Sequence, residues 1–201
     1  MIKQFFLVAL LFLFVFVSKS QFSTEEWHEG YIVTTEKDTI TGLVNYDMEA
    51  NIVQVSRKKN VKAFSSYKVF YFEIFDKIRQ NYRQFYTLPY ALKTSYKTPI
   101  IFEVLYEGNL SLLAREKIVQ EVANNNAQAW SNVRVVQPRI DHDFYFVDRK
   151  GNITYYNGQR SDLLRILSDK RGEVKDFIKE NKLKPNLMRD LIRITSFYNS
   201  I

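Results

Sequence analysis

Apolar and polar residues alternate along the first two thirds of the chain. The clearest alternating runs are Tyr31 to Thr35, Ile40 to Tyr46, Ile100 to Tyr106 and Phe144 to Arg149. A period of two residues predicts strands with one buried and one solvated face. Short turns containing charged residues or glycine separate the runs, so we expect consecutive strands to pair in an antiparallel meander.

Three positions within these runs carry specific expectations. Gly42 lies at a strand centre, which predicts a bulge or a close backbone approach. Phe70 shares one side of its run with Phe72 and Ile74, and we expect all three side chains in the core. Glu103 interrupts the otherwise apolar run from Ile100 to Tyr106.

The period changes to 3.6 residues from Ser161 onward, which predicts helices. Ser161 is expected to cap the first helix, Gly172 to end it, and Pro185 with Asn186 to open a third. Their apolar stripes must be buried against the sheet, which offers the only large apolar surface.

These patterns predict an α+β fold, an antiparallel β-meander forming a sandwich or an open barrel, followed by about three C-terminal α-helices. Residues 30–157 are expected to be mainly strand and residues 161–200 helical. No repeat, low-complexity tract or proline-rich linker divides them, so we expect one domain over residues 21–201.

The N-terminus has the pattern of a cleavable export signal over residues 1–20. Lys3 precedes an unbroken apolar run from Phe5 to Val17, and small residues follow at Ser18 and Ser20. Cleavage would leave a mature chain from Gln21 with no transmembrane segment. The alternative is an uncleaved anchor, although the run is shorter than the roughly 20 residues of a spanning helix.

Composition narrows the classes of function. The chain has no cysteine, which excludes disulfides, thiolate metal ligands and cysteine nucleophiles. Its formal charge is +7, and losing Lys3 and Lys19 with the signal leaves +5. A basic surface can attract anionic partners, but export argues against nucleic acid, and scattered lysines also serve solubility alone.

Neither histidine belongs to a spaced ligand motif. Asp141, His142 and Asp143 have suitable donor atoms, but strand neighbours point to opposite faces, so at most two could converge. No nucleophile elbow or phosphate loop is present, and Glu103, Glu107 and Asp143 are the carboxylates nearest the predicted sheet. We therefore assign no catalytic residues, no metal and no cofactor.

The candidate binding residues are aromatic. The polar stretch from Asn124 to Trp130 lies in a weakly patterned segment, residues 115–139, which is either a functional loop or a plain insertion. Trp130, Tyr82, Tyr86 and Tyr90 form the candidate binding set, because exposed aromatic patches often mark interaction sites, although such rings also fill cores.

Two segments carry a resemblance to a known group. The hairpin containing Gly30 to Val33 and Lys37 to Val44 resembles the opening of uncharacterised exported β-rich proteins of the Bacteroidota, with Lys37 replacing a frequent glycine. The stretch from Phe144 through Lys150-Gly151-Asn152 to the helices ending at Phe197-Tyr198-Asn199 is similar to the same group. The resemblance implies a location in a Gram-negative envelope or beyond, and no activity.

The sequence therefore predicts an exported, non-enzymatic binding or interaction module that is periplasmic, associated with the cell envelope or secreted. Its partner, an envelope protein or a small ligand, is not identified by the sequence. One alternative is a carrier of a small apolar ligand, with Phe70, Phe72, Phe102 and Phe144 lining a barrel-like cavity. Another is an exported hydrolase that uses carboxylates.

Overall fold

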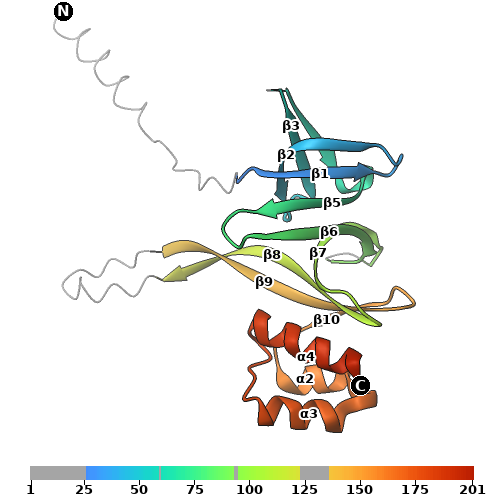
Figure 1. Cartoon of the computed structure of the whole chain (residues 1–201), viewed down its shortest axis with the longest axis vertical. Helices are drawn as coiled ribbons and strands as arrows, with labels where there is room; N and C mark the ends of the chain where they lie inside the picture. Colours follow the sequence, from blue (N-terminus) through green and yellow to red (C-terminus); the bar gives the residue numbers. More distant parts are fainter. Residues whose placement is uncertain (1–25, 59, 93–94, 123–135) are drawn as a thin grey trace, which may run out of the picture.

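The computed structural model describes residues 26–58, 60–92, 95–122 and 136–201. In this part of the chain a ten-stranded open antiparallel sheet is followed by three α-helices, which gather at one end of the molecule (Figure 1). The predicted α+β fold is confirmed.

The strands are β1 (His28–Thr34), β2 (Thr39–Asp47), β3 (Ile52–Arg57), β4 (Asn60–Ser65), β5 (Val69–Asp76), β6 (Asn81–Tyr90), β7 (Thr98–Tyr106), β8 (Leu110–Val122), β9 (Val136–Asp148) and β10 (Ile153–Tyr156). The helices are α2 (Arg160–Ile166), α3 (Arg171–Glu180) and α4 (Met188–Ser200), with 3-10 turns η1 (Ser66–Lys68) and η3 (Ser168–Lys170).

The sheet departs from a simple meander at one place. Its order is β10-β9-β8-β7-β6-β5-β1-β2-β3-β4, so β5 pairs with β1 and not with β4. The chain returns from β4 through η1, and η1 also contacts β7. The N-terminal half of the sheet is therefore curled, which brings the β2–β3 turn close to β7 and β8.

Two glycines face each other where β1 and β2 pair. Gly30 is the register partner of Gly42. A Cβ on Gly30 would lie 2.2 Å from the carbonyl oxygen of Glu73, and one on Gly42 would lie 2.5 Å from that of Ser56. The close approach predicted at Gly42 is confirmed, and it extends to Gly30 on the neighbouring strand.

Apolar side chains form three clusters. The curled N-terminal half encloses one around Phe72 and Phe85. The helices bury their stripes against β8, β9 and β10 in a second, which includes Phe144, Leu164 and Leu191. A third lies around Phe102 and Tyr145. The helical stripes are thus buried against the sheet, as the sequence predicts.

The expectation that Phe70 belongs to the core is wrong, because its side chain is 55% exposed. The pairing of β1 with β5 shifts register between Val33 and Thr34. Val69 and Phe72 are both buried although they are three residues apart, so the shift leaves Phe70 on the outside.

The predicted helix limits also need correction. The cap of α2 is Gln159, so Ser161 lies inside the helix, and Gly172 lies inside α3 and does not end α2. The third helix begins at Met188, shortly after Pro185 and Asn186.

Much of the weakly patterned segment, residues 115–139, is strand. Strands β8 and β9 pair from Leu110 with Asp148 to Val122 with Val136. Charged pairs such as Arg139 with Glu121, 2.8 Å apart, replace the apolar alternation there. The stretch from Asn124 to Trp130 lies outside the described residues.

Candidate functional site

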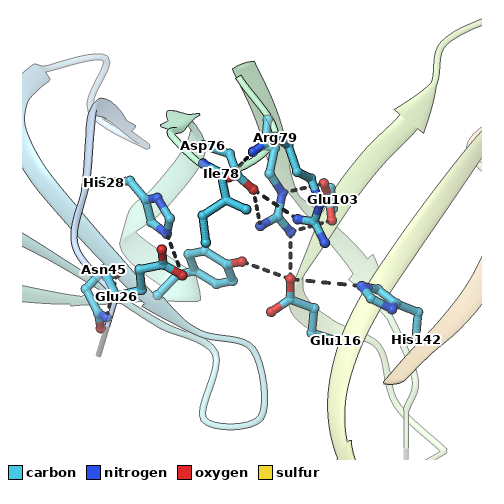
Figure 2. Close-up of polar contacts among 11 residues, drawn as sticks. Glu26, His28, Asn45, Asp76, Ile78, Arg79, Glu103, Glu116 and His142 are labelled. Atoms are coloured by element: carbon cyan, nitrogen blue, oxygen red, sulfur yellow. Dashed lines mark hydrogen bonds and ion pairs between the residues drawn. The ribbon is translucent and has the colours of Figure 1, made fainter. Parts of the chain in front are cut away.

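Strands β8 and β9 form a long hairpin-like pair, which we call the β8–β9 arm. A cavity of about 490 Å³ lies between this arm and the curled N-terminal half of the sheet. Its walls come from the start of β1, the β2–β3 and β5–β6 turns, β6, β8 and β9. Figure 2 shows Glu26 and His28 on one side, Glu116 and His142 on the other, and Asp76, Arg79 and Glu103 between them. Met48, Ile78, Ile118 and Ile140 contribute apolar surface.

The floor of the cavity is built on Arg83, a buried residue of β6. Its guanidinium donates to both carboxylate oxygens of Glu103 on β7, each at 2.7 Å. It also donates to Oε1 of Glu116 on β8 at 2.6 Å and lies 3.8 Å from Asp76 at the end of β5. One cation therefore holds carboxylates from three other strands.

The pKa values follow from this network. Burial alone would lower the pKa of Arg83, but the hydrogen bonds and charge of Glu103 raise it above its ordinary value. Burial raises the pKa of the Tyr46 phenol, which donates to Oε1 of Glu116 at 3.0 Å. Burial would raise the pKa of Asp76, but N–H groups of Ile78 and Arg79 lower it. Arg83 thus stays charged and Tyr46 stays a neutral donor.

Glu116 is the carboxylate that the network leaves half engaged. Oε1 accepts from Arg83 and Tyr46, whereas Oε2 has no hydrogen-bond partner among the described residues. Every fully buried side-chain nitrogen or oxygen in the described part of the chain is hydrogen-bonded. Oε2 is therefore not fully buried, and Glu116 is one of the residues that line the cavity.

His142 lies directly across from Glu116 in the pairing of β8 with β9. Its Nε2 is 4.0 Å from Oε1 of Glu116. Burial lowers the pKa of His142, although the charges of Glu116 and Glu103 oppose the shift. Asp143 instead binds Lys117 at 2.5 Å. The sequence predicts that adjacent residues of Asp141-His142-Asp143 point to opposite faces of the strand. The structure agrees, because His142 lies near Glu116 whereas Asp143 binds Lys117.

A second buried arginine holds the wall of the cavity in place. Arg115 on β8 donates to the carbonyl oxygens of Ile101, at 2.5 Å, and Met48. It also donates to Oδ1 of Asn51 at 3.0 Å, and that oxygen accepts from the N–H of Ile101 as well. The β2–β3 turn, which supplies Asp47, Met48 and Glu49 to the cavity, is thereby fixed to β7 and β8.

The cavity has an excess of negative charge. Six carboxylates line it or bind its floor, those of Glu26, Asp47, Glu49, Asp76, Glu103 and Glu116. Among the described residues they face three arginines: Arg79 and Arg83 at the floor, and Arg115, which is close enough to Asp47 and Glu49 to interact with their charges. The charge of Lys117 is matched by Asp143. With both histidines counted as neutral, the formal excess is three negative charges, on a chain whose net charge is +7.

Glu103, Glu116 and His142 also have a donor set that could hold a metal ion, with ligand atoms within 4.8 Å of one another. Both oxygens of Glu103 are bound to Arg83, however, and so is Oε1 of Glu116. Of this donor set, only Oε2 of Glu116 and the ring of His142 remain free to bind an ion, fewer than the three or four protein ligands of a typical zinc site. The residues present do not fit a metal.

The three predicted tyrosines, Tyr82, Tyr86 and Tyr90, lie on the other face of β6, and each ring packs against other residues. Tyr86 stacks on Tyr71 with ring centroids 5.3 Å apart, and Tyr82, which is 68% exposed, contacts Phe75. Tyr90 packs against Phe102 and Tyr145 in the third apolar cluster. Trp130 lies outside the described residues.

The four rings proposed for an apolar carrier also do not line one cavity. Phe72, Phe102 and Phe144 belong to three different clusters, and Phe70 is exposed. Sequence reasoning singled out Glu103 and His142 but missed Arg83 and Glu116. The available signal was a charged residue within a predicted strand, and Arg83, two residues before Phe85, carries it less clearly than Glu103 does, because Gln84 follows it.

Comparison with known proteins adds no assignment: no family model, curated protein or solved structure matches this chain. In the part of the chain that the structure describes, no helix has the length and apolar character needed to cross a bilayer. The resemblance to exported Bacteroidota proteins stays a prediction.

Proposed function

We propose that this protein is an exported, non-enzymatic binding module of the cell envelope and that the cavity between β6 and the β8–β9 arm receives a small polar ligand. The observation that carries the proposal is the cavity of about 490 Å³ with an organised charged floor. Its volume falls within the range of about 300 to 1,000 Å³ that is typical of ligand pockets.

The same floor argues against the two alternatives. An apolar ligand would displace water from Oε2 of Glu116, which has no other hydrogen-bond partner among the described residues, and this is costly. The hydrolase alternative relied on carboxylates such as Glu103, and both oxygens of Glu103 are bound to Arg83, which leaves this residue no free oxygen for proton transfer. Binding of a polar ligand is the function that the charged floor supports best.

Native mass spectrometry tests the proposal on protein purified gently from its own envelope fraction. We expect a bound small molecule that is lost from Ile118→Trp, because a larger ring at this cavity-lining position would occupy the ligand's space. Tyr82→Trp is the matched control, since it adds a ring at an exposed position on the other face of β6. A polypeptide as the only bound mass, or a small molecule retained by Ile118→Trp, would refute the cavity as the ligand site.

Location has its own test. N-terminal sequencing of the protein from the envelope fraction should give Gln21 as the first residue. Recovery of the chain with Met1 from the cytoplasm would remove export from the proposal and leave the cavity unaffected.

A further inference from the structure

We infer that the ligand is an organic cation, with an ammonium or guanidinium group that binds Oε2 of Glu116. This inference rests on the proposed function and adds the chemical class of the ligand. The structure provides three arguments, which are the charge of the cavity, the free oxygen and the apolar wall.

The first argument is charge complementarity. The basic groups of the site are already used, because Arg83 is bound to Glu103 and Glu116, and Arg79 is bound to Asp76 at 3.0 Å. Among the described residues, the carboxylates of Glu26, Asp47 and Glu49 line the cavity without an ion pair to an arginine or lysine, although Arg115 lies near the latter two. An anionic ligand would meet this excess of negative charge, whereas a cation would reduce it.

The second argument is the position of the acceptor. Arg83 and Tyr46 hold Glu116 through Oε1, so the carboxylate is already oriented before a ligand arrives. Oε2 is then a fixed acceptor at the cavity surface. A charge-assisted hydrogen bond to such a pre-oriented oxygen is stronger and more directional than one to a mobile surface carboxylate.

The third argument concerns the rest of the ligand. Ile118 and Ile140 are register partners on the β8–β9 arm and both line the cavity beyond Glu116. Ile78 and Met48 line it from the two turns. An inorganic cation would not use these side chains, but an alkyl or aryl chain that carries the cationic group would cover them.

Isothermal titration calorimetry with three probes of equal chain length tests the inference on the mature protein. We expect 1-hexylammonium to bind with a dissociation constant of about 1 mM or tighter, and at least about tenfold more tightly than 1-hexanol. Hexanoate should bind more weakly still. The three probes share their apolar contacts, so the differences report the charge.

Variants separate this inference from the proposed function. Glu116→Gln should weaken 1-hexylammonium binding about tenfold, because the amide removes the charge with little change in shape. Glu36→Gln is the control, since it removes an equal charge from a surface pair with Lys68 outside the cavity. A ring inserted by Ile118→Trp should abolish binding of all three probes.

Three outcomes would overturn the inference. If 1-hexanol or hexanoate binds as tightly as the ammonium, and Ile118→Trp abolishes that binding, the cavity is a ligand site for another class of molecule. If zinc or calcium chloride binds in the calorimeter and Glu116→Gln abolishes it while 1-hexylammonium gives no heat, the site takes a metal ion. Failure of all three probes and both salts to bind would contradict the inference and the proposed function together.

Discussion

Arg83 and Glu116 are joined by a hydrogen bond of 2.6 Å between the guanidinium and Oε1, which links β6 to β8 although 33 residues separate the two in sequence. The two strands are not neighbours in the sheet, since β7 lies between them. The bond therefore spans β7, and Glu103 on β7 binds the same guanidinium. The cavity floor is a single connected unit.

Removing Arg83 should destabilise the protein strongly. Arg83→Met leaves Asp76, Glu103 and Glu116 close together without their common cation, and we expect a loss of about 3 to 5 kcal/mol in the free energy of unfolding. Urea denaturation at neutral pH measures it. The double variant Arg83→Met with Glu103→Met should recover part of the loss, because the pair is then replaced by apolar side chains. A single-variant loss below about 1 kcal/mol would contradict the network as described.

Arg115 should matter for the wall of the cavity in a different way. Arg115→Met removes the donors to Met48, Ile101 and Asn51, and we expect a loss of about 3 kcal/mol, because buried acceptors are left unsatisfied. Hydrogen exchange should show faster opening of the β2–β3 turn. Arg149→Met is the control, since Arg149 makes an exposed contact with Asn109. Unchanged exchange in the turn would show that Arg115 does not hold it.

Two glycine-to-alanine substitutions compare a position where packing leaves no room for a Cβ with a position where it does. Gly30→Ala should cost about 2 kcal/mol, because its Cβ would meet the backbone of β5, which cannot rotate away. Gly172→Ala in α3 has open space around the new methyl group and should be neutral or gain about 0.5 kcal/mol. Thermal unfolding of both variants measures the contrast. Equal midpoints would mean that β1 and β5 can separate without cost.

Stability should fall on acidification because of His142. Burial places the pKa of His142 below its ordinary value of about 6.5, with Glu116 and Glu103 raising it and Arg83 and Arg79 lowering it further. Between the folded pKa and about 6.5 the unfolded chain binds more protons, so this contribution is complete above that window and decreases as the pH falls through it.

The non-titrating variant His142→Gln should lose this component. We compare the unfolding free energies of the two proteins between about pH 8 and about pH 5. The wild-type protein should lose its advantage over the variant as the pH falls, because only the wild-type protein has the contribution of His142. A constant difference across the range would show that His142 is not buried as a neutral group.

Much of the fold could be predicted because the sequence alternates clearly where one face of a strand is buried. The hairpin of β1 and β2 and that of β9 and β10 follow this pattern closely. The pattern is weaker in β8 and β9, because polar pairs lie on each face of these two strands, as in Glu116 with His142 and Lys117 with Asp141. Phe70 was misplaced because a register shift in the partner strand has no signature within its own run.

The site was less accessible to sequence reasoning. Asp76, Arg83, Glu103, Glu116 and His142 come from five strands, and their convergence depends on the curl of the sheet and on the insertion of β1 between β2 and β5. Strand alternation placed His142 and Asp143 on different faces, which the ion pair of Asp143 with Lys117 bears out. It could not say which residues of other strands His142 would meet.

The measurement that tests the central claim most directly is an imidazole NMR spectrum of the mature protein during titration with a small-molecule extract of its own envelope fraction. The chain has two histidines, His28 and His142, and both line the cavity, so their signals report on it alone. The account predicts that both signals shift on titration and that Ile118→Trp abolishes the shifts. Ligand binding detected by mass spectrometry while both signals stay in place would contradict it, because the ligand would then lie elsewhere on the protein.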